Sequence, residues 1–586
     1  MIDEMIDYHS HLAVLQEFLK ITGGTPEENS VLQAGKDDPD AAFIGAWIDH
    51  LVIHADSDGF ELDLLEKAAG IWSNAVAIYG QLGEAQSGIE QALGSPPPAN
   101  AADLVAQALQ KLVAARDSAL ASQADIEALK ASIEPLPHIR PHPRQQDVKE
   151  PSWDNGNRFL GRRTVSFLNE AFSKANSKRE RAVCAGLISS YAGNLCGSAY
   201  LGTVVAGPRR LHRFRDRIAR NAVGAHLHKT KATPKLSGAG LFGAAPGAPL
   251  PADIAAFLQS AFAVAYPGRS VPDFDAGYGK LIRHLQLLER FKRVDLPMPP
   301  ANGFVQNVPP TDVGDILAAS GIDSDLSISS APDSDPTTPN TSDSKSSSGA
   351  GCILGILLIF AFLIMLVVCI VQAIDKGKCT VFDFLAPDPP DPRDPTTPAP
   401  EASAALTALQ NPDNAAHFLQ EIFNMRMVMW QGLDSALAYL AVTGLIYPDD
   451  LLMSSPLYQQ FLRTPGRPEW PLRLDPQAEQ TYHRDPLTAV ENPAVGVHSQ
   501  PFPPELAPDA FVDSGQTMLY NNVASKLSGS QFAYIFLRDL VKGKPDRRNR
   551  DLDADRGFMH ECWDIADGTS INDPILSVKI LPENAL

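Results

Sequence analysis

One uncharged apolar run limits the architectures open to this chain more than any other feature. Gly351–Ile374 reads GCILGILLIFAFLIMLVVCIVQAI, without a charged residue. Since an α-helix rises about 1.5 Å per residue, about 20 such residues cross the ~30 Å hydrocarbon core of a bilayer. The alternative is a helix buried in a large soluble core, but such helices usually keep a polar stripe. The run therefore predicts one transmembrane helix over 351–374.

The segments on both sides of the run have the composition of linkers. Residues 301–350 end in a stretch rich in Ser, Asp, Pro and Thr, which is too polar to bury a core. Within the second linker, 380–404, Pro387–Pro400 has seven prolines in fourteen residues and favours extended polyproline II. The pattern predicts two folded bodies that disordered linkers connect to a membrane helix.

Charge and cysteine content limit the partners and the compartment. The 586 residues carry a net charge of −20, which argues against nucleic acid as a partner. Of six cysteines, two lie within the apolar run, so a disulfide framework is not expected. The N-terminus lacks a basic region followed by an apolar one, as a secretory signal would have.

These features predict a single-pass protein of the cytoplasmic membrane. Lys376 and Lys378 after the run favour a C-terminus inside. Against this, the long N-terminal body would fold before the run is made, with no signal to export it. We therefore expect the N-terminus in the cytoplasm and the C-terminus outside.

Helical periodicity dominates the chain before the run. Apolar residues recur at three- and four-residue spacing over 2–20, 41–55, 60–93 and 101–133, and breaks such as GSPPPAN separate these stretches. The pattern predicts a helical bundle over 1–134 and a second helical domain over 153–300.

The region after the run has a different pattern. Ala415–Ile446 has a helical apolar stripe, and Ile575–Leu581 reads as a strand. We expect an α+β domain over 405–586. The predicted fold class is thus mainly α: a helical cytoplasmic body, one transmembrane helix and an α+β C-terminal domain.

Two histidines on one predicted helix are candidate metal ligands. His50 and His54 are four residues apart in WIDHLVIHADSDGFE, with Asp49 and Asp56 beside them, so both rings project from one face. Zinc would need two further ligands. The alternative is two half-exposed histidines at the edge of an amphipathic helix.

A small-residue helix over Ala182–Tyr200 contains SSYAGN within RAVCAGLISSYAGNLCGSAY. It resembles the helical zinc-dependent phospholipase C family, whose signature is an Ala/Gly-rich helix bearing His-Tyr-x-x-Asp. The resemblance implies a helical fold and places Ser190 and Asn194 where that family has its metal ligands. A hydroxyl and an amide do not replace an imidazole and a carboxylate at a zinc site. We therefore expect a degenerate metal site without catalysis.

Positive charge is concentrated just after this helix. Between Arg209 and Lys235 there are nine Lys or Arg and a single acid, Asp216. The cluster predicts binding of anionic lipid or of a protein partner; the alternative is an ordinary solvated helix face. The candidate residues are Arg209, Arg210, Arg213, Arg217 and Arg220.

Near the C-terminus, DLDADRG places Asp551, Asp553 and Asp555 at alternate positions, as in calcium-binding loops. The sixth position is Arg556 and the twelfth Cys562, where an EF-hand has Gly and Glu. A charged surface loop is the alternative, and no other cofactor is expected.

No complete catalytic motif accompanies these features. We expect a non-enzymatic single-pass adaptor that binds membrane lipid and a protein partner. Its layout resembles the membrane proteins associated with bacterial contractile injection systems, which implies an injection-system particle as partner. The alternative is a membrane-bound lipid phosphodiesterase of the phospholipase C type.

Overall fold

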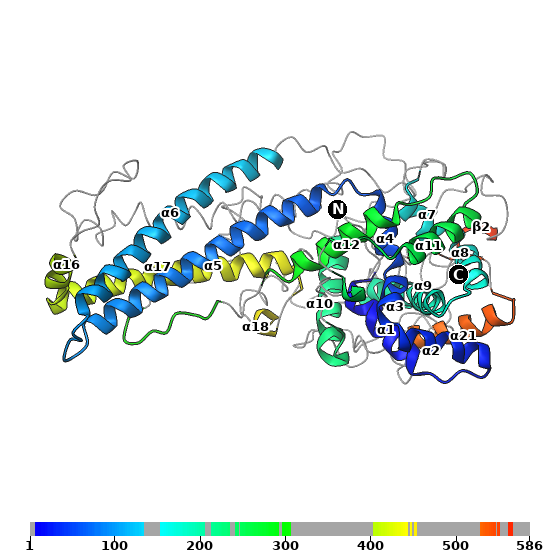
Figure 1. Ribbon diagram of the computed structural model, residues 1–586, viewed down its shortest axis with the longest axis horizontal. Helices are drawn as coiled ribbons and strands as arrows, with labels where there is room; N and C mark the ends of the chain where they lie inside the picture. The colour runs from blue at the N-terminus through cyan, green and yellow to red at the C-terminus, as the bar shows by residue number, and fades with distance from the viewer. Residues whose placement is uncertain are drawn as a thin grey trace.

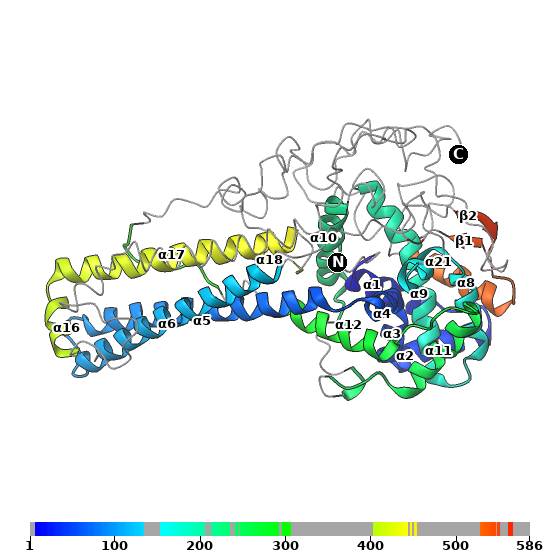
Figure 2. The same cartoon turned by 90° about the horizontal axis from the view of Figure 1, so that it is seen from above.

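A computed structural model describes the parts of the chain that form the folded body (Figure 1). These parts are residues 6–133, 153–204, 213–234, 241–244, 247–291, 296–305, 402–442, 446–447, 450–453, 512, 528–545, 548–550, 552 and 561–566. They build a globular head and a long helical arm that projects from it (Figures 1 and 2).

The head is made of short and medium-length helices. Its helices are α1 (Tyr8–Lys20), α2 (Pro26–Asp37), α3 (Pro39–Ala46), α4 (Ile48–Asp56), α7 (Asn155–Gly161), α8 (Thr164–Lys174), α9 (Lys178–Val204), α10 (Arg213–Lys231), α11 (Ala252–Ala265), α12 (Phe274–Leu288) and α21 (Gly529–Val541), with a 3₁₀ turn, η3, at Leu241–Gly243.

The small-residue helix α9 is the centre of the head, and α1, α2, α3 and α21 pack around it. Its composition permits this, because α3 and α9 cross with their backbones in contact. A Cβ at Gly45 of α3 would overlap the carbonyl oxygen of Val183, and a Cβ at Gly186 of α9 would overlap that of Ala42. Two glycines are therefore the reason why α3 and α9 approach so closely.

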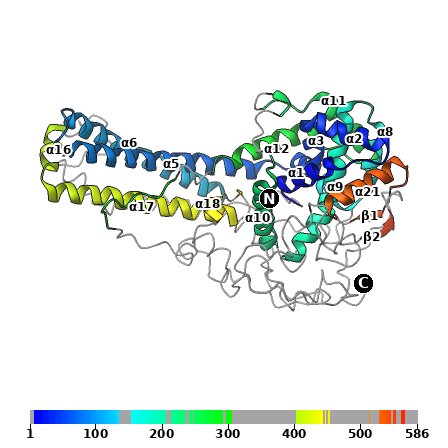
Figure 3. The ribbon, with the colours of Figure 1, turned by 90° about the horizontal axis from the view of Figure 1, so that it is seen from below.

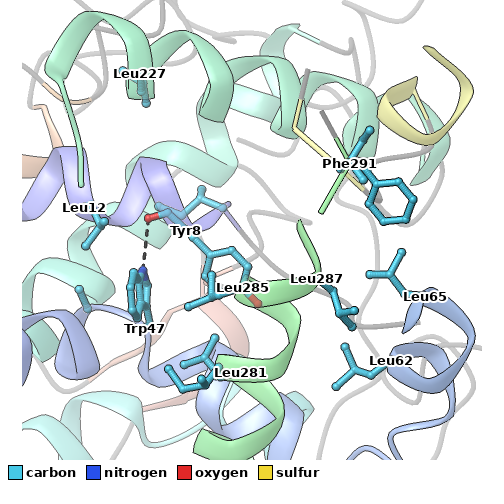
Figure 4. Packing of buried hydrophobic residues seen from close by; sticks show 14 of the residues in the cluster. Tyr8, Leu12, Trp47, Leu62, Leu65, Leu227, Leu281, Leu285, Leu287 and Phe291 are labelled. Carbon is cyan, nitrogen blue, oxygen red and sulfur yellow. Dashed lines mark hydrogen bonds between the residues drawn. The ribbon is translucent and has the colours of Figure 1, made fainter. Parts of the chain in front are cut away.

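The packing of α4 and α12 beside α1 closes the head. Trp47, between α3 and α4, donates its indole N–H to the backbone oxygen of Tyr8 at 3.3 Å. Leu281 and Leu285 of α12 are buried in the same cluster (Figure 4). Leu287 and Phe291 continue this core towards the first turns of the arm (Figure 4).

The arm consists of α5 (Phe60–Ala92), α6 (Ala101–Ile133) and α17 (Pro412–Val442), with α16 (Ala402–Leu409) at its far end (Figures 2 and 3). A helix of 33 residues is about 50 Å long. Arg426 of α17 fixes α17 to α5, because it donates to Gln86 Oε1 at 2.8 Å and lies 5.3 Å above the ring of Tyr79. The short helix α18 (Asp450–Met453) follows α17.

The prediction of a separate α+β domain after the apolar run is wrong. The C-terminal helix α21 packs on α9, where Phe536 lies 4.8 Å from the ring of Tyr191. The Tyr534 hydroxyl donates to Glu28 Oε2 of α2 at 3.1 Å, and α17 belongs to the arm. Since one core includes helices from both sides of the run, the chain after 402 completes the N-terminal body instead of folding apart from it.

Strands are minor in the part of the chain that can be described. The antiparallel pair of β1 (Arg548–Arg550) and β2 (Glu561–Ala566) is its only sheet. Strand β1 lies beside α7 and α8, and Leu552 donates its N–H to the backbone oxygen of Leu160 at 3.1 Å. The predicted strand at 575–581 lies outside the described residues.

The predicted single-pass membrane protein, with its N-terminus inside and its C-terminus outside, is also wrong. Among the described helices none combines the length and the apolarity that crossing a bilayer requires. Moreover, the two bodies that were expected on opposite faces of a membrane share one core, which a bilayer between them would not permit. The run 351–374 itself lies outside the described residues, as do 306–350 and 380–401 of the predicted linkers.

Candidate metal centre

Three side chains of metal-ligand type meet where α1 and α4 pack against α9. They are His11 of α1 and the adjacent residues Asp49 and His50 of α4, and one ligand atom of each lies within 4.8 Å of the others. His11 and His50 are 0% exposed and Asp49 is 1% exposed. The three residues form the candidate metal centre.

Asp49 is the acidic residue of this centre, and its surroundings favour the ionised carboxylate. Burial raises the pKa of its carboxyl, but the charges of His11 and His50 and hydrogen bonds from His11 and Asn194 outweigh burial and lower the pKa to about 2. His11 Nε2 lies 3.1 Å from Asp49 Oδ2, and Asn194 Nδ2 donates to the same oxygen at 3.0 Å. The head therefore contains a buried carboxylate anion next to two imidazoles.

Several polar atoms of the centre are buried without a hydrogen-bond partner among the described residues. They are His11 Nδ1, Asp49 Oδ1 and, on the neighbouring Asn194, Oδ1. A buried polar atom without a partner costs about 1–3 kcal/mol, so a cluster of such atoms indicates a ligand that pairs with them. A cation bound by the three ligand side chains is one such partner.

The donor set fits a divalent transition metal. Imidazole nitrogen and carboxylate oxygen are zinc ligands, and three of them with a fourth donor give tetrahedral coordination. With bonds of about 2.0–2.1 Å, neighbouring ligand atoms of such a site lie about 3.4 Å apart. Small side-chain movements from the present spacing would give this geometry for the three ligands, and the Asn194 amide, which donates to Asp49 Oδ2 at 3.0 Å, orients the carboxylate.

One residue of each of two predicted pairs lies at this centre. His50 belongs to the centre, and His54 lies one turn further along α4. Of the two positions that the phospholipase C resemblance singles out, Asn194 of α9 contacts the centre through Asp49, and Ser190 is buried one helical turn earlier. Asp56 is not part of it, because its carboxylate accepts the Asn155 side-chain amide at 3.0 Å and the Gly156 N–H at 3.2 Å at the start of α7.

Sequence reasoning missed His11, which supplies a ligand from another helix. The signal for it was the stretch YHSH at the start of α1, where Asp7 caps the helix by accepting the N–H of His9 at 2.8 Å. Tyr8 and His284 were missed as well. The Tyr8 hydroxyl lies 3.2 Å from His54 Nε2 and 2.8 Å from His284 Nδ1.

The basic cluster is only partly described. Arg209 and Arg210 lie outside the described residues, and Arg213 and Arg217 are on α10. Arg220 of the same helix is buried, so it does not belong to a solvated face. Asp551, Asp553 and Asp555 of the predicted calcium loop lie outside the described residues.

A second histidine pair joins α10 to α1. The rings of His9 and His228 stack at 4.2 Å, and both Nδ1 atoms contact Thr233 Oγ1, at 2.9 and 3.0 Å. Burial, and then the charge of His228, lower the pKa of His9 well below its usual 6.5. His9 is therefore neutral in the folded head at pH 7.

Acidification should accordingly destabilise the head. Because the pKa of His9 is lowered on folding, its contribution to stability is complete above pH 6.5 and is lost as the pH falls below that value, by up to ~1.4 kcal/mol per pH unit. Urea unfolding of chelator-treated protein between pH 7.5 and 5.5 measures this. His9→Gln should flatten the pH dependence.

His417→Gln is the control for this experiment, because His417 is exposed on α17. Burial also raises the pKa of Asp7, which acts in the opposite direction at lower pH but is common to all variants. An unchanged slope in His9→Gln would contradict the role of His9.

Comparison with known proteins adds no relative: no family model matches the chain, and no curated protein and no solved structure matches it. The resemblance to the phospholipase C family and the layout resemblance to injection-system proteins stay predictions.

Proposed function

We propose that this protein is a non-enzymatic helical scaffold whose head holds one divalent metal ion, zinc by its ligand set, at His11, Asp49 and His50. The observation that carries the proposal is the convergence of three fully buried ligand side chains from two helices. In the described structure His11 Nδ1 and Asp49 Oδ1 also lack a hydrogen-bond partner. Structural zinc sites are closed by protein ligands, whereas catalytic sites keep an open position. The burial of this centre favours the structural role.

The role of the ion follows from the position of its ligands. His11 belongs to α1 and Asp49 and His50 to α4, and Asn194 connects the centre to α9. An ion here would hold these three helices together at the base of the arm. The arm then serves as the surface for a protein partner, as the adaptor hypothesis requires. The comparison with injection-system proteins depended on a membrane span and a separate outer domain, and it gives no further support.

A metal-dependent phosphodiesterase is the second candidate. It is favoured by one observation: Asn194, which the phospholipase C resemblance places at a metal-ligand position, donates to Asp49 Oδ2 of the triad at 3.0 Å. A metal with an open position could activate water for hydrolysis. The closed surroundings make this the weaker candidate.

Metal content tests the proposal directly. Full-length protein purified without chelator and without a metal-affinity column should contain about one zinc ion per chain, since three convergent ligands specify one site. Inductively coupled plasma mass spectrometry measures the metal content. His11→Ala and His50→Ala should each lose most of the metal, whereas the exposed His417→Ala should keep it.

The same samples separate the two candidates. The scaffold predicts no hydrolysis of phosphodiester substrates with or without added zinc. Protein that contains no metal after purification and binds none on addition would refute the proposed function, and zinc-dependent turnover that is lost in His11→Ala would favour the enzyme.

A further inference from the structure

His54 and His284 lie next to the candidate metal centre and share the hydroxyl group of Tyr8. His54 of α4 and His284 of α12 each direct one ring nitrogen at Tyr8 Oη, at 3.2 and 2.8 Å. Tyr8 belongs to α1, so three helices meet at this oxygen. Since a phenol has one proton, it donates to one imidazole nitrogen and accepts an N–H from the other.

His54 and His284 extend the centre into a row of four imidazoles with His11 and His50. The ring of His11 lies 5.2 Å from that of His50, and His54 follows His50 by one helical turn on the same face of α4. The rings of His54 and His284 are 5.6 Å apart. The Tyr8 ring stacks on His50 at 4.1 Å, so it lines the step from His50 to His54.

The row runs from the interior of the head towards its surface. His11, His50 and His54 are 0% exposed, whereas His284 is only partly buried. Trp47 and, on α12, Leu281 and Leu285 are buried near Tyr8, whose hydroxyl joins the row (Figure 4). His284 is thus the most exposed imidazole of the row.

A metal ion that enters a buried centre needs ligands along its way in. A cation that crosses apolar packing without ligands loses its hydration without compensation, which is strongly unfavourable. Imidazoles at successive steps provide replacement ligands along the way. Without them, loading has to wait for α12 to separate from α4.

We propose that His54 and His284, on either side of the Tyr8 hydroxyl, form an exchangeable loading site for a divalent transition-metal ion and pass it to His11, Asp49 and His50. The ion replaces the hydrogen bonds between Tyr8 and the two imidazoles and then exchanges onto His50. This inference depends on the proposed metal-binding function, because it concerns how the same centre is filled.

A loading site affects rates rather than the final affinity. We expect His284→Gln to slow both zinc association and zinc dissociation about tenfold in the full-length protein, which corresponds to a barrier raised by about 1.4 kcal/mol on the way in and out. The dissociation constant should stay unchanged, because it is the ratio of the two rates and both fall by the same factor. Stopped-flow mixing of metal-stripped protein with zinc and a fluorescent zinc chelator measures both rates.

Two further variants exclude a purely structural explanation. His284→Cys restores a zinc ligand and should bring back most of the rate, which a packing defect would not allow. His417→Gln, an exposed histidine of the arm, should load like the unaltered protein.

Each outcome has a separate meaning. Unaltered protein that binds no zinc at equilibrium overturns the proposed function itself. Unaltered protein that binds zinc while His284→Gln loads at the same rate overturns the loading site alone. A large loss of affinity in His284→Gln also overturns it, because His284 would then be a ligand of the final centre.

Discussion

Removal of metal by a strong chelator should lower the melting temperature of this protein by about 8–16 °C. A ligand present at about 1,000 times its dissociation constant stabilises the folded state by ~4 kcal/mol, and 1 kcal/mol corresponds to about 2–4 °C for a cooperative unit of about 150–250 residues. Without the ion, Asp49 stays buried as a carboxylate with Oδ1 unpaired in the described structure. The ion would also no longer connect α1 to α4. Differential scanning calorimetry with and without chelator measures the shift.

Histidine variants provide the controls for this shift. His50→Ala should melt near the temperature of the chelated protein and should not respond to chelator, since its site is already lost. His228→Ala, which removes a histidine outside the triad, should keep the response. A melting temperature of the unaltered protein that does not depend on chelator would contradict a structural ion.

Gly186→Ala should be the most damaging single-methyl change in the head, with a loss of about 3 kcal/mol or more in the free energy of unfolding. The new Cβ would overlap the backbone oxygen of Ala42, which a side-chain rotation does not relieve. The helices α3 and α9 would have to separate. Since Asp49 is in the first turn of α4, which follows α3 after one residue, and Asn194 lies on α9, the same change should weaken metal binding. Urea unfolding and metal content measure both effects.

Two glycines of the arm are matched controls. Around Gly70 and Gly80 of α5, no atom of the described structure lies within 4 Å of an added Cβ. Gly70→Ala and Gly80→Ala should therefore stabilise the arm slightly, by up to ~1 kcal/mol, because Ala loses less backbone entropy in a helix. A Gly186→Ala protein as stable as these variants would show that α3 and α9 are not in backbone contact.

Helix positions were predictable because their signals are local. The expected helices at 60–93 and 101–133 correspond to α5 and α6, separated by GSPPPAN. The helix expected from Ala182 to Tyr200 lies within α9, and the long helix expected after the linkers is α17. Apolar periodicity, caps and prolines act over a few residues, so they can be recognised in the amino-acid sequence alone.

The arrangement of these helices was not predictable in the same way. An apolar stripe indicates that a helix packs against another element, but it does not indicate which element. The stripe of α17 was assigned to a separate domain, whereas it packs on α5, more than 300 residues earlier in the chain. The expected division by a membrane failed for the same reason, since it treated chain order as spatial order.

The candidate centre illustrates both levels. That His50 and His54 share a helix face, and that Ser190 and Asn194 lie on a small-residue helix, can be read from the order of residues, because these are relations of one turn within one element. Packing between helices was needed to bring His11, 38 residues before Asp49, to this face, and to close it with Asn194, 145 residues after Asp49. A metal site needs donors around a point, and donors from separate helices come together only when the glycine contact of α3 with α9 and the packing of α1 have placed those helices.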